Sequence, residues 1–186
     1  MRPWLRSSSK TYNFQVQVIT VRKVTKQDVV DPYSFAMDSA LHALAPRARS
    51  RDELFKLLIK REIDIDIANS VLDELELQGL LNDLEFANIW AESRQRQKKL
   101  SKRVISGELR TKGVAQDIID EVIAKIDDEA EYQLAFSLAE KKFRSCSHLE
   151  PEKIYSRISG LLARKGFGAG LASRIVRELL GSVASN

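Results

Sequence analysis

The 186-residue sequence contains few cysteines, histidines, glycines and prolines. Its single cysteine, Cys146, leaves no intramolecular disulfide to form, which is typical of a protein from a reducing cytoplasm. One cysteine and two histidines also argue against a zinc site of the usual kind. Eight glycines and four prolines are few for a chain of many short strands joined by tight turns. The composition therefore favours a mostly helical protein.

Long apolar runs are missing as well. No stretch reaches the roughly 18 consecutive apolar residues of a membrane-spanning helix, so we expect no membrane segment. The first ten residues lack the apolar core and the small-residue cleavage pattern of a secretory signal. With 44% hydrophobic and 30% charged residues, the composition is that of a folded soluble protein. We expect a cytoplasmic location.

The sequence also lacks catalytic motifs. It has no phosphate-binding glycine loop, nucleophile elbow, paired-histidine metal motif or cysteine–histidine signature. The glycines at 166, 168 and 170 lie in a predicted helix-to-helix turn without a preceding strand, so we interpret them as a turn and not as a nucleotide loop. We therefore expect no enzymatic activity, no cofactor and no metal.

The first thirty or so residues differ in pattern from the rest. Tyr12, Phe14, Val16 and Val18 alternate with polar residues, which is the period of a half-buried strand. A lone hairpin is marginal in water, so this segment must dock on the rest, pair with a partner or stay mobile. We interpret residues 1–31 as an N-terminal arm, either a short β segment or poorly ordered, which Pro32 closes.

From Ser34 onward the apolar residues follow helical spacing, and three segments align with one another. The offsets are 51 residues, from Leu58 to Leu109, and 53 residues, from Leu109 to Leu162. The same register relates three further sets of apolar residues: Ile67, Ile118 and Leu171; Val71, Val122 and Ile175; Leu75, Ile126 and Leu179. So many matches in one register indicate a repeat.

Each repeat is predicted to contain three helices. The predicted boundaries are 32–81, 82–127 and 128–186, with Gly181 closing the last helix. A three-helix unit of about fifty residues barely supports its own core, and stacking against a neighbour would help it. We therefore predict an all-α protein of three tandem three-helix repeats that form an elongated curved array.

Capping and turn residues mark the helix ends. Ser50 is expected to open the second helix of the first unit, with Glu53 completing a capping box. Gly113 and Gly166 lie where the chain must leave a helix through a left-handed residue. Glu62 occupies the matching place in the first unit, which suggests a different turn there.

Three aromatic residues, Phe86, Trp90 and Phe143, recur at helical spacing. Rings with that spacing pack into helical cores, although flat rings can also stack on nucleic-acid bases. We expect these three to be core residues.

The net charge is only +4, but the charge is unevenly distributed. One short stretch contains eight basic residues: Arg94, Arg96, Lys98, Lys99, Lys102, Arg103, Arg110 and Lys112. Within that stretch they are opposed only by Glu108, and an acidic stretch follows. Charged outer faces are common on helical repeats, but this concentration of like charge is unfavourable through mutual repulsion. We interpret it as a polarised surface for a charged partner.

Three short runs in the repeats are similar to family motifs. Residues 79–94, GLLNDLEFANIWAESR, match G-L-L-[DN]-D-x-x-F-A-x-x-W-x-x-S-R. Residues 108–114, ELRTKGV, match E-L-x-x-K-G-[IV], and residues 162–167, LARKGF, match L-x-R-[KR]-G-F. In these runs the chain resembles the regulatory protein RecX family of bacterial recombinase modulators. The likeness extends from Ser34 to about Leu180 and departs at Ser101-Lys102, where many members have Gly-Pro.

The resemblance implies a non-enzymatic protein that binds the RecA recombinase filament on single-stranded DNA. Such a protein lodges in the filament groove and inhibits ATP hydrolysis and strand exchange, which limits recombination and the SOS response to DNA damage. We expect a monomer whose partner-binding residues are Arg94, Arg96, Lys98, Lys99, Lys102, Arg103 and Lys112, with Arg164, Lys165, Arg174 and Arg177 as a second footing. The alternatives are a direct binder of single- or double-stranded DNA through this basic surface, and a helical scaffold for another partner.

Overall fold

A computed structural model describes the backbone of residues 31–184 and the side chains as far as Gly181. The expected N-terminal arm lies outside these residues, apart from Asp31, which caps the first helix. All regular structure in the described range is helical, which confirms the all-α prediction. The helices are α1 (Pro32–Leu44), α2 (Arg51–Lys60), α3 (Ile65–Leu77), α4 (Asp83–Ser93), the π-helical turn η1 (Arg94–Lys98), α5 (Lys102–Thr111), α6 (Gln116–Ala124), α7 (Asp128–Arg144), α8 (Pro151–Lys165) and α9 (Ala169–Ala184). None of them is long and apolar enough to cross a membrane.

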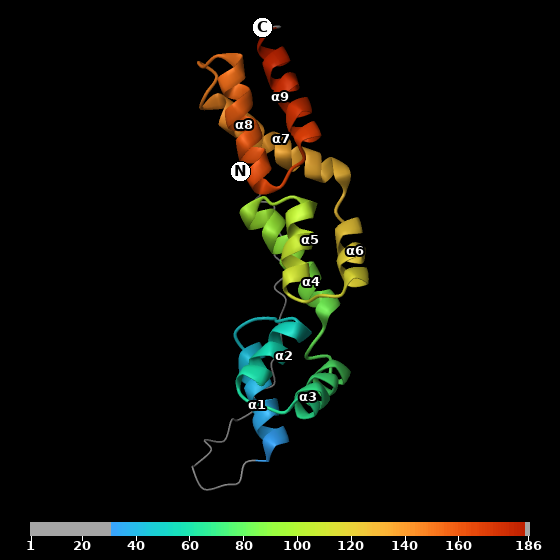
Figure 1. Ribbon diagram of the computed structural model, residues 1–186. Coiled ribbons are helices and arrows are strands. Elements are labelled where there is room, and N and C mark those ends of the chain that lie inside the picture. Colours follow the sequence, from blue (N-terminus) through green and yellow to red (C-terminus); the bar gives the residue numbers. More distant parts are fainter. Residues whose placement is uncertain (1–30, 185–186) are drawn as a thin grey trace, which may run out of the picture. The chain divides into compact units, whose positions relative to one another are not determined.

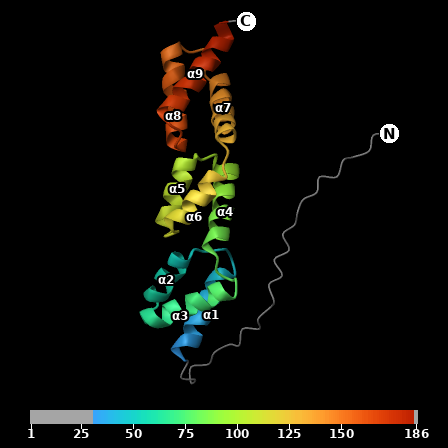
Figure 2. The ribbon, with the colours of Figure 1, turned by 90° about the vertical axis from the view of Figure 1, so that its right-hand side faces the viewer.

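The helices form three units, α1–α3, α4–α6 and α7–α9, as Figures 1 and 2 show. Each unit has its own hydrophobic core. Leu58, Leu109 and Leu162, which the offsets of 51 and 53 relate, are all fully buried. The prediction of three three-helix repeats is confirmed, while the unit boundaries and the curvature of the array stay predictions. Because the three cores are separate, other groups must join the units.

The second helix of every unit ends in the same left-handed turn. Glu62 has φ 61°, Gly113 has φ 72° and Gly166 has φ 90°. The next residue then donates its N–H to a carbonyl near the helix end: Ile63 to Leu58 at 3.3 Å, Val114 to Leu109 at 3.2 Å, and Phe167 to Leu162 at 3.0 Å. The prediction of a different turn at Glu62 is therefore wrong. The repeated packing imposes the left-handed conformation even where the residue is not glycine.

Contacts between units explain why only the later two turns carry glycine. A Cβ on Gly113 would lie 2.3 Å from the Cβ of Asp52, which belongs to the preceding unit. A Cβ on Gly166 would lie 2.2 Å from Cγ2 of Val104, again in the preceding unit. Glu62 belongs to the first unit and is exposed. Glycine is thus required where two units meet, and a side chain is tolerated at the outer end.

Two other helix-end predictions need correction. Ser50 caps α2 by accepting the N–H of Glu53 at 3.2 Å, but the Glu53 carboxylate does not complete a capping box. It binds Arg47 and Lys112 instead, because a charged partner offers a stronger hydrogen bond than a backbone N–H. Gly181 does not close the last helix, because α9 continues to Ala184 and a helix tolerates an interior glycine at a cost of about 1 kcal/mol.

Gly113→Ala should destabilise the protein more than Gly79→Ala does. Gly79 has φ 70° and nothing within 4 Å of an added Cβ, so its variant incurs only the left-handed penalty of about 1–2 kcal/mol. At Gly113 the same penalty applies, and the clash with Asp52 adds roughly 1–3 kcal/mol. Urea unfolding of the two variants measures the difference. Equal losses would contradict the packing of this turn against the preceding unit.

Glu62→Gly should stabilise the protein by up to about 1 kcal/mol, because glycine adopts the left-handed conformation without a Cβ penalty while its freer unfolded chain offsets part of the gain. The midpoint of urea unfolding is the measurement. Glu62→Ala is the matched control, since it removes the carboxylate and keeps the Cβ. If alanine stabilised the protein as much as glycine, backbone strain at Glu62 would not be the cause.

Candidate partner-binding surface

Matching residues join the units at two places. We call the contact of α2 with the second unit the first joint, and the contact of α5 with the third unit the second joint. At the first joint, Ser50 Oγ donates to the Lys112 carbonyl at 2.6 Å. At the second, the Ser101 N–H donates to the Lys165 carbonyl at 3.0 Å. In both cases the serine that caps a helix start binds the helix end of the next unit.

The helix starts at the joints also receive a carboxylate from the following unit. The Arg51 N–H donates to Asp83 Oδ1 at 2.8 Å, and the Lys102 N–H donates to Glu131 Oε1 at 2.8 Å. These N–H groups have no partner within their own helix, and negative charge is favourable at a helix N-terminus. Burial raises the pKa of Asp83, although the bond from the Arg51 N–H opposes this effect. The joints are therefore formed by polar groups, and their hydrogen bonds fix how each helix start meets the next unit.

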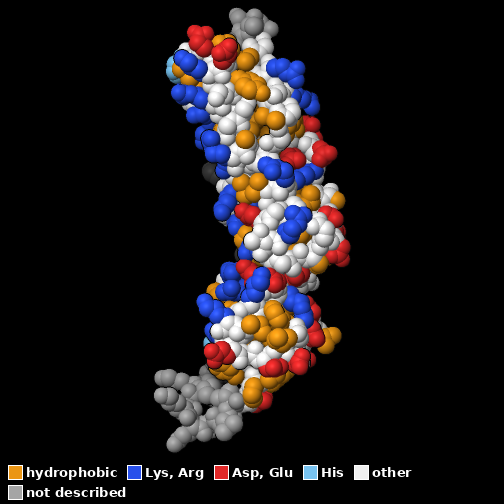
Figure 3. All heavy atoms as spheres, in the orientation of Figure 1, with side chains coloured by type: hydrophobic (Ala, Val, Ile, Leu, Met, Phe, Trp, Pro, Cys, Tyr) orange, Lys and Arg blue, Asp and Glu red, His pale blue; other side chains and the backbone are white. Residues whose placement is uncertain are grey.

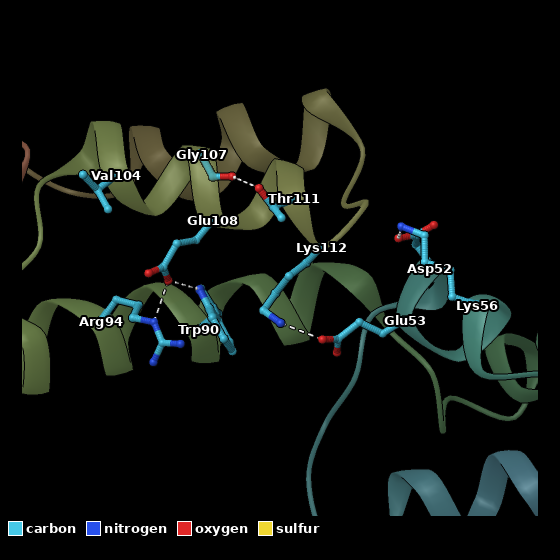
Figure 4. A pocket seen from close by; sticks show the side chains of 10 residues that line it. All are labelled: Asp52, Glu53, Lys56, Trp90, Arg94, Val104, Gly107, Glu108, Thr111 and Lys112. Atoms are coloured by element: carbon cyan, nitrogen blue, oxygen red, sulfur yellow. Dashed lines mark hydrogen bonds and ion pairs between the residues drawn. The ribbon is translucent and has the colours of Figure 1, made fainter. Parts of the chain in front are cut away.

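A groove of about 730 Å³ opens at the first joint (Figure 4). Its lining residues are Asp52, Glu53, Lys56, Trp90, Arg94, Val104, Gly107, Glu108, Thr111 and Lys112. The Arg94 guanidinium lies 3.7 Å from the centroid of the Trp90 ring, and the Lys112 ammonium lies 4.1 Å from it. Glu108 accepts from Trp90 Nε1 at 2.8 Å and from Arg94 Nε at 2.6 Å.

Trp90 packs partly buried against the core of the second unit, and its ring also supports two cations at the groove. Phe86 is buried in the core of the second unit as predicted, and Phe143 packs partly buried against the core of the third.

Lys112 is neutralised within the groove. Its Nζ donates to Glu53 Oε1 at 2.6 Å, and the two side chains are only 18% and 19% exposed. Burial by itself raises the pKa of Glu53, but hydrogen bonds from Arg47 and Lys112 outweigh burial and hold the pKa below its ordinary value. Glu53 is thus ionised at neutral pH, and its negative charge neutralises the Lys112 ammonium group.

Most of the predicted binding residues near the joints already have partners inside the protein. The pairs are Arg94 with Glu108, Lys102 with Asp128, Lys112 with Glu53, Arg103 with the Gly166 carbonyl at 3.1 Å, and Lys165 with the Lys98 carbonyl at 2.7 Å. Glu108 is the acid that lies within the basic stretch itself, and Asp128 belongs to the acidic stretch that follows it. Lys102 lowers the pKa of Asp128, which it reaches from the preceding unit. Glu108 and Asp128 lie 14 and 26 residues from their partners and Glu53 lies 59 residues away, so only the fold shows which acid pairs with which cation.

The remaining predicted residues point outward. Arg96, Lys98, Lys99, Arg164, Arg174 and Arg177 are exposed. Arg96 makes only a loose pair with Glu92 at 3.8 Å. The Lys98 and Lys99 ammonium groups have no hydrogen bond or ion pair to any residue that the structure describes. Arg174 lies over the Tyr132 ring at 4.6 Å and Arg177 Nε binds the Ser173 carbonyl, so both are held within the third unit.

Two basic segments that were predicted separately meet at the second joint. The Lys165 Nζ bond to the Lys98 carbonyl spans 67 residues of sequence, and Arg103 reaches Gly166 beside it. We call Lys98, Lys99, Arg103, Arg164 and Lys165 the second-joint patch. Figure 3 shows basic side chains along the edge that α8 occupies and acidic ones along the opposite edge at α6. The helices agree, because α8 has four basic residues against one acidic, and α6 has three acidic and no basic residues.

Known proteins share this order of three three-helix units. Models of the first, second and third three-helix domains of RecX match residues 36–75, 82–123 and 129–176. The chain belongs to the RecX family. It is 40% identical to a Regulatory protein RecX of Streptomyces coelicolor over 150 residues, which cover 81% of this chain and 80% of the relative. It is 39% identical to a Mycobacterium avium Regulatory protein RecX over 137 residues, covering 73% and 79% of the two chains.

A solved structure shows the same fold. The crystal structure of RecX from Lactobacillus salivarius matches with a TM-score of 0.74 at 25% identity, over 80% of this chain and 97% of that one. Four residues of the RecX-like motifs line the groove at the first joint: Trp90, Arg94, Glu108 and Lys112. In this chain, these RecX motif residues therefore bind one another and the preceding unit.

Sequence reasoning missed the structural roles of Glu53 and Trp90. One signal was local, because Trp90 and Arg94 are four residues apart and thus lie on the same face of a helix. The other was not, because Glu53 and Lys112 are 59 residues apart and only the packing of the two units brings them together.

Lys112→Met should cost about 2 kcal/mol of folding free energy, because it removes the more buried of the two cations that pair with half-buried Glu53 and leaves only Arg47. Lys56→Met is the matched control, since Lys56 lines the same groove and pairs with Asp52 but is 68% exposed. Exposed pairs contribute roughly 0–1 kcal/mol, so this variant should change little. Urea unfolding measures both. Equal effects would show that the Glu53–Lys112 pair does not stabilise the joint.

Proposed function

We propose that this RecX-family protein binds the RecA recombinase filament and mainly inhibits its ATPase and strand-exchange activities. By this action it limits recombination and the response to DNA damage, without enzymatic activity, cofactor or metal of its own. Family membership supports the regulatory role. The observation that carries the proposal for this chain is the second-joint patch, whose cations have no acidic partner among the described residues.

The patch suits an anionic or mosaic surface. Unneutralised cations at the surface attract such a surface and set the orientation in which it docks. A filament repeats the same protomer many times, so a chain of three units can contact more than one protomer. Several modest contacts then act as one strong contact, because the later ones form at a high effective concentration.

The internal pairs narrow the set of residues that contact the partner. Arg94, Lys102 and Lys112 bind acids within the protein, so we assign Lys102 and Lys112 to the joints and Arg94 to the second unit. Arg96, Lys98 and Lys99 become the main contacts, with Arg103, Arg164 and Lys165 beside them. Arg174 and Arg177 on α9 form a second contact region for the partner.

Lys98→Glu/Lys99→Glu should weaken the inhibition of RecA by at least about tenfold, because each reversal replaces an attraction with a repulsion of similar size. The measurement is RecA ATPase activity on single-stranded DNA against the concentration of the variant. Lys141→Glu/Lys142→Glu is the matched control, since it reverses two adjacent lysines at the end of α7. Circular dichroism checks that both variants stay helical. Full inhibition by the first variant, or equal loss in both, would contradict this assignment of the surface.

Two other functions make different predictions in one experiment. Co-sedimentation of the protein with RecA filaments and with naked DNA over a salt series separates them. Binding that requires RecA supports the filament regulator. Equal affinity for DNA alone, falling steeply with salt as counterions are released, would identify a direct DNA binder. Binding to neither would leave a helical scaffold for another partner.

A further inference from the structure

We propose that Lys165 is a positioning residue, which holds the turn that presents Lys98 and Lys99 to the partner. The partner-binding surface is then complete only when the third unit is docked on the second. The identity of the partner rests on the proposed function, whereas the positioning of the turn does not.

The turn before α5 has an unusual backbone. Helix α4 continues into the π-helical turn η1, and Lys99 then adopts φ 54° and ψ 47°. π-helical turns are rare and are frequently found at functional sites. The left-handed conformation is disfavoured for a residue with a Cβ, so neighbouring groups must hold Lys99 in it. This backbone carries Lys98 and Lys99, whose ammonium groups have no partner among the described residues.

Within the second unit the Lys99 and Leu100 N–H groups donate to the Gln95 and Arg94 carbonyls, and the third unit supplies two further groups that hold the turn. Lys165 Nζ donates to the Lys98 carbonyl at 2.7 Å, and the Lys165 carbonyl accepts the Ser101 N–H at 3.0 Å. One residue therefore binds both sides of Lys99. Leu100, only 8% exposed, lies between these two bonds and anchors the turn in the core of the second unit.

The first joint provides an internal comparison. Lys112 occupies in the second unit the place that Lys165 occupies in the third, and both precede a left-handed glycine. Lys112 binds the carboxylate of Glu53, but the residue of α5 that matches Glu53 at the offset of 51 is Val104. Without that carboxylate, Lys165 binds a neutral carbonyl and keeps its charge unneutralised beside Lys98. The same backbone position is thus neutralised at one joint and basic at the other.

Lys165→Met tests the inference, because methionine keeps most of the side-chain length and loses the ammonium group. Amide hydrogen exchange at Lys99, Leu100 and Ser101 should become roughly tenfold faster when one hydrogen bond to the turn is lost. Affinity for RecA filaments should fall by more than Arg164→Met lowers it, although each variant removes one positive charge from α8. Lys165→Arg, which can still donate to the Lys98 carbonyl, should restore both properties.

A second variant tests the same idea through the opposite side chain. Val104→Glu places a carboxylate where the first joint has Glu53, so it should draw Lys165 away from the turn and reproduce both effects. In the Lys98→Glu/Lys99→Glu background, Lys165→Met should lower the affinity no more than Arg164→Met does, because the position of the turn no longer matters once its two lysines are replaced.

The outcomes separate this inference from the proposed function. Equal losses of affinity for Lys165→Met and Arg164→Met, with unchanged exchange at Lys99 and Leu100, would show that Lys165 acts only as a charge and would overturn the inference. If the unaltered protein does not bind RecA filaments, the proposed function fails, and the exchange measurement still decides whether Lys165 positions the turn.

Discussion

The connection between units depends on one constraint, which is that a helix start must meet a helix end. The starts of α2 and α5 carry N–H groups without partners in their own helix, and the ends of α5 and α8 carry unpaired carbonyls. Buried polar groups require hydrogen bonds, so Ser50 and Ser101 can dock only where the Lys112 and Lys165 carbonyls lie. Hydrogen bonding therefore sets the register between units, and the glycines that follow those lysines let the backbones approach closely enough.

Separate cores and polar joints give the protein the energetics of a repeat array, in which stability is a sum of unit and interface contributions. The first joint contains two carboxylates with opposite pH dependence. Folding lowers the pKa of Glu53, so its contribution is present above the pKa of a free glutamate and is lost as the pH falls through the lowered value. Folding raises the pKa of Asp83, so its contribution is lost as the pH rises through that value.

The sequence predicted what depends on local pattern. The offsets between Leu58, Leu109 and Leu162 identified three helical units, because each unit repeats the same buried positions. The turn at Glu62 was not predictable from residue type, because tertiary packing overrides the preference of glutamate for other conformations. The partners of the basic residues were not predictable either, because they lie 14 to 67 residues away and only the packing of the helices brings them together. A list of charges along the chain does not distinguish a cation that binds an internal carboxylate from one that faces solvent.

A repeat array can acquire a binding surface by changing a side chain while keeping the backbone of the joint. Glu53 and Val104 occupy matching positions, and Lys112 and Lys165 occupy the matching positions opposite them. With a carboxylate present the lysine is neutralised and the joint is structural. With valine present the lysine binds a carbonyl on the turn of Lys98 and Lys99. The joint then keeps a positive charge, and the turn holds its two lysines in a fixed orientation. Places where the backbone repeats and the charge does not are therefore where function is to be sought in such a protein.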